Sequence, residues 1–456
     1  MTNQKEQKEK LTTQPYKGAR DFYPQEMRVR NYIFSVWKRV CNRFGFEEYD
    51  FPILEPLEIF AAKTGEEIVN QQLFSFEDRG GRKLAIRPEL TPGTVRMLAQ
   101  KFGELTPPVK WFMIGNNWRY EKPQLGRGRE FYQLEANIFG IDEVEADFEI
   151  FTLILAIMQE FGANETMFEL FVSDRRLIGA LLQDTLKLSE NQTLETRRLM
   201  DKRKKLEKEA FMAALADVGL NLSQAETVEK YMNCSLAELD QVISPKVLQT
   251  NKGYQNINKL FSLIKKAGFE KYVSFDPSII RGFDYSDGLV YEVFDKNPAN
   301  RRSMFGGERF DRLINIFGNY NMAATGFAMG DWTLLEFLKN WKLLPEFGTS
   351  ETDYLVTVWP KSDNSEDNNG SDTKFYEASN EVAKALRAKN KNVTIWTGAN
   401  TKLDKQLKYA DKKSITYAII IGEDELKAGQ VTVKDLKSQK QETKSLEMFL
   451  AEIKSN

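Results

Sequence analysis

Hydrophobic and polar positions follow two different periods along the chain, and the changes of period mark the expected elements. In residues 28–45 (RVRNYIFSVWKRVCNRFG) apolar side chains recur at helical spacing and a glycine ends the run, which predicts a helix. The next segment, FEEYDFPILEP, reads as a strand that Pro52 interrupts. The mixture continues to residue 174, and strand patterning returns between Tyr272 and Phe317.

Between these parts, the chain is rich in Lys, Glu and Leu, and SLAELDQVI and NINKLFSLIKKAGF have helical spacing. We therefore expect residues 176–266 to form a helical insertion in a domain made of residues 15–175 and 267–342. A linker is expected at residues 343–352, and residues 1–14 are polar enough to be disordered.

Strands and helices alternate in the C-terminal part. DYLVTVWP is a buried-strand pattern, residues 362–372 form a low-complexity loop, and a helix, a strand, a basic helix and the strand YAIIIGEDE follow. This order predicts a small α/β domain with a largely parallel sheet over residues 353–456.

Composition narrows the class of protein. The 456 residues are 41% hydrophobic and 29% charged, as in soluble globular chains of two to four domains. Eighteen consecutive apolar residues occur nowhere, and the polar N-terminus has no secretory signal pattern. Two cysteines cannot form a disulfide framework, so we expect a cytoplasmic protein without membrane contact.

The chain contains no histidine. This excludes Ser-His-Asp and Cys-His triads and every metal site with an imidazole ligand. Any proton transfer must use Asp, Glu, Lys, Tyr or the substrate itself.

The richest candidate for chemistry is residues 111–140. In the second half, apolar residues from Tyr132 to Ile138 alternate with Gln133, Glu135 and Asn137, so one strand face is apolar and the other polar. The loop KPQLGRGRE carries cations beside two glycines. Such a hairpin could hold a polyphosphate and a small polar ligand, although the pattern alone slightly favours an ordinary solvated hairpin.

Taken in order, the motifs resemble those of the histidyl-tRNA synthetases, a family of class II aminoacyl-tRNA synthetases. KGARDFYP is similar to the family's start, FEEYDFPILEP to motif 1, IRPELTPG to its R-P-E-x-T segment and WRYEKPQLGRGREFYQ to motif 2. RGFDYSDGLVYEVF resembles the histidyl signature peptide, and GFAMGDWTLLEFL occupies the motif 3 position. The end of the chain is similar to the family's anticodon-binding domain.

The resemblance implies an α+β fold: a six-stranded antiparallel sheet flanked by helices, with a helical insertion and a C-terminal α/β anticodon-binding domain. It also implies a homodimer that uses ATP, with accompanying Mg²⁺, to activate L-histidine and transfer it to tRNA(His). No dedicated protein metal site is expected.

The resemblance also implies roles for individual residues. Arg119, Arg281 and Gln133 are the catalytic candidates. The ATP-binding candidates are Arg119, Glu121, Arg127, Arg129 and the motif 3 position Thr333. The amino-acid-binding candidates are Glu89, Thr91, Gln133, Glu135, Asn137, Arg281, Tyr285, Ser286, Glu308 and Phe310. The tRNA-binding candidates are Gln124, Lys402, Lys405, Lys408, Lys412 and Lys413.

Several positions depart from the family pattern. Thr333 stands where motif 3 has an arginine, so Arg129 or Arg309 would substitute for it, or ATP binding is altered. Asn137 stands where a carboxylate usually faces the imidazole; three further differences in the side-chain pocket are Ser286, Glu308 and Phe310. Glu135 or Glu308 is then expected to supply the acceptor.

Three alternatives remain open on the sequence. One is a regulatory paralogue of the first histidine-biosynthesis enzyme, although such proteins generally lack the C-terminal domain. The others are an RNA-binding sensor without activation chemistry and a class II synthetase of another specificity.

Overall fold

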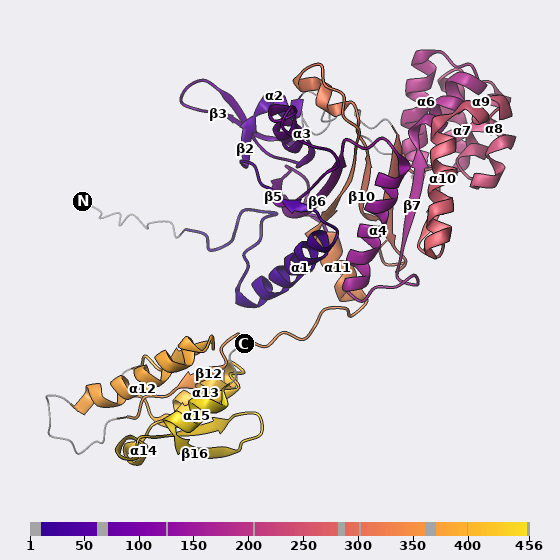
Figure 1. Ribbon diagram of the computed structural model, residues 1–456. Coiled ribbons are helices and arrows are strands. Elements are labelled where there is room, and N and C mark those ends of the chain that lie inside the picture. Colours follow the sequence, from indigo (N-terminus) through magenta and orange to yellow (C-terminus); the bar gives the residue numbers. More distant parts are fainter. Residues whose placement is uncertain are drawn as a thin grey trace, which may run out of the picture. The chain divides into compact units, whose positions relative to one another are not determined.

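The computed structural model describes residues 11–61, 72–124, 126–203, 206–280, 288–300, 302–360, 371–398 and 400–453. The chain divides into two compact units, residues 1–344 and 345–456 (Figure 1).

The first unit is built on a sheet of eight strands. Its order is β1-β5-β6-β11-β10-β9-β7-β8, in which the six central strands are antiparallel to their neighbours. The expected sheet of six strands therefore gains one parallel strand at each edge. The strands are β1 (Glu47–Glu48), β5 (Val109–Trp118), β6 (Glu130–Phe139), β11 (Ala324–Gly330), β10 (Ser303–Arg309), β9 (Leu289–Asp295), β7 (Phe168–Asp174) and β8 (Val273–Phe275).

Three helices cover one face of this sheet: α1 (Pro24–Arg43), α4 (Val144–Glu160) and α11 (Asp331–Asn340) (Figure 1). Their apolar sides share one core with Leu134, Ala136 and Ile138 of β6. The two-faced strand predicted for this segment is therefore confirmed, since its polar residues lie on the opposite face.

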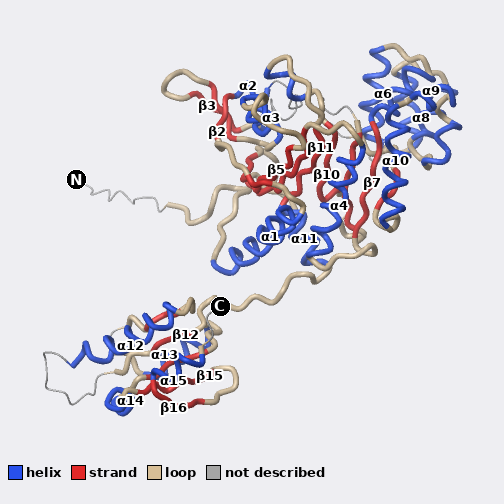
Figure 2. The backbone as a smooth tube through the Cα atoms, in the orientation of Figure 1, coloured by secondary structure: helices blue, strands red, loops and turns tan. Residues whose placement is uncertain are grey.

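Smaller elements complete the first unit. A second sheet has the order β2-β4-β3 and lies beside two helices (Figure 2). These are β2 (Leu54–Pro56), β3 (Phe74–Glu77), β4 (Lys83–Ile86), α2 (Leu57–Ala61) and α3 (Thr91–Gln100). The helices between β7 and β8 are α5 (Arg175–Gly179), α6 (Glu190–Lys202), α7 (Lys208–Asp217), α8 (Leu222–Tyr231), α9 (Pro245–Thr250) and α10 (Lys252–Ala267).

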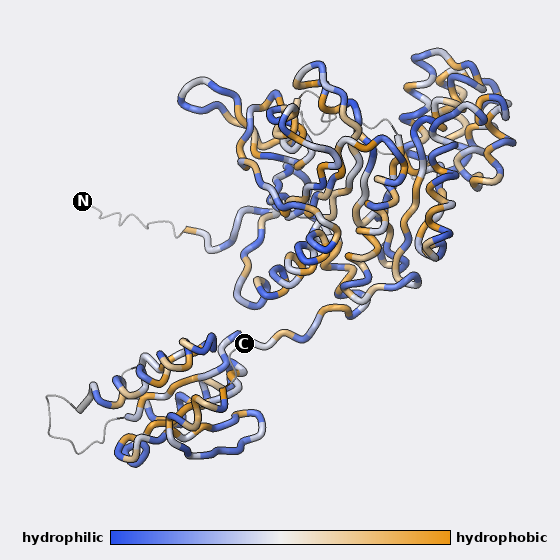
Figure 3. Tube along the Cα trace, in the orientation of Figure 1, coloured by the Kyte–Doolittle hydropathy of each residue, from blue (hydrophilic) through white to orange (hydrophobic). Residues whose placement is uncertain are grey.

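Hydrophobic and hydrophilic positions alternate along these helices (Figure 3). Their apolar sides pack together through residues such as Phe211, Tyr231 and Leu260. The last helix ends at Gly268, whose φ of 75° is a left-handed conformation that glycine adopts without strain.

The C-terminal unit has a five-stranded sheet of order β13-β12-β14-β15-β16. β13, β12 and β14 are parallel to one another, whereas β15 and β16 form an antiparallel hairpin next to β14. The sheet is therefore mixed and not largely parallel as expected. The elements are β12 (Tyr354–Val356), α12 (Ser371–Ala388), β13 (Val393–Ile395), α13 (Leu403–Lys412), β14 (Tyr417–Ile420), α14 (Glu423–Ala428), β15 (Gln430–Asp435), β16 (Gln441–Ser445) and α15 (Leu446–Glu452).

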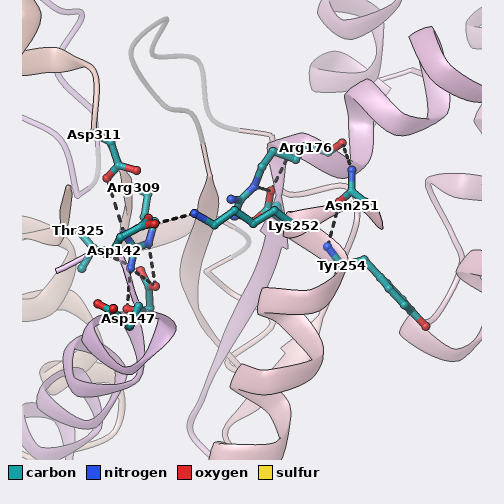
Figure 4. Close-up of polar contacts among 11 residues, drawn as sticks. Asp142, Asp147, Arg176, Asn251, Lys252, Tyr254, Arg309, Asp311 and Thr325 are labelled. Carbon is teal, nitrogen blue, oxygen red and sulfur yellow. Dashed lines mark hydrogen bonds and ion pairs between the residues drawn. The ribbon is translucent and has the colours of Figure 1, made fainter. Parts of the chain in front are cut away.

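A buried ion pair joins α4 to the middle of the main sheet (Figure 4). The Asp147 carboxylate accepts hydrogen bonds from Arg309 Nε at 2.8 Å and from Thr325 Oγ1 at 2.7 Å. Arg309 also donates to the carbonyls of Ile141 and Glu143 in the turn before α4. One carboxylate thus fixes β10, β11 and α4 relative to one another.

Removing this carboxylate should destabilise the first unit strongly. Asp147→Ala removes the only buried carboxylate among the described ion-pair partners of Arg309, whose side chain is 2% exposed; Asp142 and Asp311 lie farther away, at 3.9 and 3.7 Å. Breaking such a buried pair costs about 3–5 kcal/mol. Urea denaturation of the full chain measures the loss. Glu104→Gln, which breaks the exposed pair with Lys101, should cost less than about 1 kcal/mol. Equal losses in the two variants would contradict the structural role of Asp147.

Candidate active site

A cavity of about 910 Å³ lies on the polar face of the main sheet. Its walls come from β6, β10 and β11, from the start of α11 and from the β5–β6 loop. This volume is large enough for a nucleotide together with an amino acid, since small-molecule sites commonly measure about 300–1,000 Å³.

Strand register explains why the floor of the cavity is open. Gly326 of β11 pairs with Asn137 of β6 on one side and with Glu308 of β10 on the other. In the next row, Ala328 lies between Glu135 and Gly306. Polar side chains on β6 and β10 are thus separated by small residues, which leaves space above the sheet between them.

The glycine at position 326 is required by this packing. A Cβ atom there would lie 1.8 Å from Asn137 Oδ1 and 2.5 Å from the carbonyl oxygen of Ala136. Asn137 itself is 1% exposed, and its side chain favours the ionised form of the neighbouring Glu135 carboxyl on the same face of β6. The floor therefore presents an amide next to a buried carboxylate.

Glu135 is the centre of a buried hydrogen-bond network. Its carboxylate accepts from Thr91 Oγ1 at 2.6 Å, from Thr94 Oγ1 at 3.0 Å and from Tyr49 OH at 3.2 Å. Burial raises the pKa of this carboxyl above its ordinary value, and these hydroxyl donors oppose the shift. Burial also raises the pKa of the Tyr49 phenol, which therefore remains a hydrogen-bond donor.

Gln133 and Arg119 lie closer to the β5–β6 loop. Gln133 Oε1 accepts from Asn117 Nδ2 at 3.0 Å, which holds the amide in place on the cavity wall. Arg119 donates Nε to the carbonyl of Pro88 at 2.8 Å and lies over the Phe131 ring. Glu89 is also a buried wall residue.

The loop between β5 and β6 forms part of the cavity mouth through Glu121, Gln124, Gly126, Arg127 and Gly128. Arg127 forms an ion pair with Glu121, and both residues line the cavity. Gln124 lies at the same edge and accepts from Arg302 Nη2 at 3.1 Å.

Arg129 has a different environment and does not line this cavity. Its guanidinium lies 4.0 Å from the Tyr120 ring centre and 5.1 Å from that of Tyr16. The backbone N–H groups of Arg129 and Glu130 donate to the carbonyl of Gly18. Arg129 thus joins the loop to the N-terminal segment and is held away from the cavity.

The expectation that Arg309 replaces the motif 3 arginine is wrong. Its guanidinium lies on the opposite side of the sheet, where Asp147 and two carbonyls occupy it. Thr333 does line the cavity, and its hydroxyl donates to the carbonyl of Met304 at 2.7 Å. Phe310 also lines the cavity and packs against the Phe139 ring.

The remaining predicted residues cannot be placed in this cavity. Arg281, Tyr285 and Ser286 lie outside the described residues. The five predicted lysines belong to the C-terminal unit, where all are exposed on or next to α13: Lys402, Lys405, Lys408, Lys412 and Lys413.

Several site residues are absent from the sequence-based prediction. Tyr49 and Thr94 reach Glu135 from a strand end and from α3, and no local pattern marks them. Arg302 and Trp332 also line the cavity, and neither was assigned to the site from the sequence. The position of Trp332 directly before Thr333 was the one available signal.

On α13, a tyrosine lies within the lysine face. Helical spacing places Tyr409 on the same side as Lys402, Lys405 and Lys412, whereas the acidic residues Asp404 and Asp411 lie on the other exposed side. The Tyr409 ring contacts Trp396 edge-on at 5.5 Å. Exposed aromatic and cationic side chains of this kind bind unpaired bases and their phosphates.

The described residues contain neither a metal-binding cluster nor a membrane-spanning helix. Among them, no group of three or more Cys, Asp or Glu side chains is arranged to hold a metal ion. No helix in the described ranges is both long and apolar enough to cross a membrane.

Comparisons with known proteins agree with the sequence motifs. Residues 18–331 match the model of the family described as histidyl-tRNA synthetase, and residues 355–456 match that of an anticodon-binding domain. A histidine–tRNA ligase from Leptospira biflexa is 41% identical over 98% of both chains. A chloroplastic/mitochondrial histidine–tRNA ligase from Arabidopsis thaliana is 34% identical over 95% of this chain and 85% of its own length.

The fold is also found in solved structures. The crystal structure of a histidyl-tRNA synthetase from Nostoc sp. PCC 7120 covers 96% of this chain and 98% of its own, with a TM-score of 0.77 at 22% identity. At that identity the likeness establishes the fold, whereas the family match and the relatives establish descent. The chain belongs to the histidyl-tRNA synthetase family.

Proposed function

We propose that this chain activates histidine with ATP and transfers it to the 3′ end of tRNA(His). In the first step, a carboxylate oxygen of histidine attacks the α-phosphorus of ATP, and pyrophosphate leaves. In the second step, a ribose hydroxyl of the tRNA attacks the adenylate's carbonyl carbon, and AMP leaves. The observation that carries the proposal is the meeting of Arg119, Gln133 and Glu135 in one cavity of a chain from this family.

Fixed cations supply the stabilisation that this chemistry needs. The attack joins two anions and builds charge on the phosphate oxygens, which guanidinium groups held in place stabilise. In the proposal, Arg119 binds the α-phosphate, and Arg281 lies between that phosphate and the carboxylate. Glu121 and Arg127 orient ATP, whose accompanying Mg²⁺ neutralises part of its charge. No protein imidazole is required, which agrees with a chain that contains none.

Glu135 is the proposed acceptor for the imidazole N–H of the substrate, with Glu308 as the second candidate. Both carboxylates line the cavity and both are buried. Thr91 holds Glu135 in position through a hydrogen bond. In the proposal, Glu89 and Gln133 bind the backbone end of the substrate amino acid. An amino acid that cannot donate a hydrogen bond to the buried carboxylate would bind more weakly, because an unpaired buried polar group costs free energy.

The C-terminal unit is the proposed contact for the tRNA anticodon. Its lysine face would bind phosphates, and the ring of Tyr409 would stack on an unpaired base. Gln124 would meet the acceptor end at the cavity mouth. A homodimer and a cytoplasmic location also belong to the proposal, and both cysteines are free and buried as a reducing compartment allows.

Amino-acid-dependent ATP–pyrophosphate exchange tests the activation step. Among the twenty amino acids, histidine alone should support exchange. Glu135→Ala should lower kcat/KM for histidine by about 10- to 100-fold, the usual effect of losing a hydrogen bond to a charged group. Glu308→Ala distinguishes the second candidate. If neither variant changed histidine activation, the proposed acceptors would be wrong, and exchange with another amino acid would overturn the specificity.

The buried carboxyl of Glu135 should reduce stability at neutral pH. Its folded-state pKa is raised, so ionisation above the ordinary value of about 4.3 costs folding free energy. Glu135→Gln should therefore be more stable than the wild type at pH 8, and the difference should disappear below pH 4. Thermal unfolding between pH 4 and pH 8 measures it. Glu226→Gln on exposed α8 is the control, and a difference independent of pH would contradict the assignment.

Salt dependence tests the lysine face. The triple change Lys402→Ala, Lys405→Ala and Lys412→Ala should weaken tRNA binding. It should also make the slope of log affinity against log salt shallower by about 2, since each lost phosphate contact removes about 0.7. The control triple Lys427→Ala, Lys437→Ala and Lys440→Ala changes exposed lysines elsewhere in the same unit. Equal slopes in the two triples would remove this face from the interface.

A further inference from the structure

We infer that Arg302 binds the terminal phosphates of ATP and supplies the positive charge that Thr333, at the motif 3 position, lacks. This inference rests on the proposed function, because it assigns a residue to the same nucleotide site. Arg302 directly precedes β10 and is exposed at the cavity mouth.

The partners of the cavity arginines differ. Three arginines line the cavity among the described residues: Arg119, Arg127 and Arg302. Arg127 already has a carboxylate partner in Glu121. The Arg302 guanidinium has one contact within the described structure, with the neutral amide of Gln124. Its charge is therefore available to an anion.

The backbone beside Arg302 is anchored at the motif 3 position. Thr333 Oγ1 donates to the carbonyl of Met304, the second residue of β10, at 2.7 Å. Ser303, between Met304 and Arg302, donates its hydroxyl to the carbonyl of Phe305. The uncharged Thr333 thus fixes the strand end from which the guanidinium of Arg302 extends toward Gln124.

Carboxylates outnumber guanidinium groups in the described part of the cavity, which makes the charge of Arg302 important for binding an anion. Six glutamates line the cavity alongside the three arginines within the described ranges. A polyphosphate that enters this cavity meets an excess of carboxylates, so each unpaired cation contributes strongly to its binding. If the charge of Arg302 is removed, Arg119 is the remaining arginine of the cavity, among the described residues, that is not paired with a carboxylate.

Position decides which part of the nucleotide Arg302 contacts. Arg119 is half-buried, and the buried carboxylates of Glu135 and Glu308 lie on the cavity floor. Arg302, Gln124 and Arg127 are exposed at the mouth. The reacting α-phosphate belongs near the floor, where the amino acid must meet it, so the terminal phosphates extend to the mouth. Arg302 is then placed to hold the leaving pyrophosphate.

Comparison of ATP with AMP tests this assignment. By calorimetry without amino acid, Arg302→Ala should raise the Kd for Mg-ATP by about 10- to 100-fold, as expected for losing a charged hydrogen bond, and change the Kd for AMP less than about threefold. Arg302→Lys, which keeps the charge, should recover part of the loss. Arg198→Ala, an exposed arginine on α6, should bind both nucleotides like the wild type.

Each other outcome overturns the inference. Unchanged ATP binding in Arg302→Ala removes the residue from the site, and an equal loss for ATP and AMP places it at the nucleoside or α-phosphate. Histidine-dependent exchange by the wild-type chain separately tests the proposed function. A wild type that binds ATP without exchange would reject that function and still report on Arg302.

Discussion

The Asp147 carboxylate fixes the framework on which the cavity depends. It lies beneath the sheet and holds Arg309 of β10 and Thr325 of β11, whose next residues along the strands, Glu308 and Gly326, face the cavity. Residues adjacent in a strand point to opposite faces, so a fixed position below sets the position above. A buried ion pair contributes little net stability compared with apolar packing, but it defines one register of strands and helix.

Above the sheet, the cavity combines two electrostatic environments. The floor holds buried carboxylates, among which Glu135 is surrounded by hydroxyl donors from separate elements. The mouth holds the guanidinium groups of Arg127 and Arg302, which remain exposed to solvent. A polar amino acid side chain suits the first environment and a polyphosphate the second. The cations at the mouth oppose the repulsion between the cavity carboxylates and the phosphates.

The local motifs were sufficient to predict much of this arrangement. Period-two alternation placed Gln133, Glu135 and Asn137 on one strand face, and the hairpin followed from the glycine-containing loop between two strands. The order of motifs along the chain indicated the family. Pairing with β1 and β8 was not predictable, since two- and three-residue strands give no periodic signal and depend on neighbours distant in sequence.

The sequence by itself determined the class of fold through the order of its family motifs. It also determined the polar face of β6 and the exclusion of imidazole chemistry, because these depend on local periodicity and composition. Only the tertiary structure decided which cations are available. Arg129, Arg302 and Arg309 look equivalent in the sequence, yet one lies between tyrosine rings, one is exposed at the cavity mouth and one is buried against Asp147. The charge of an arginine is a local property, whereas its partners come from segments that only folding brings together.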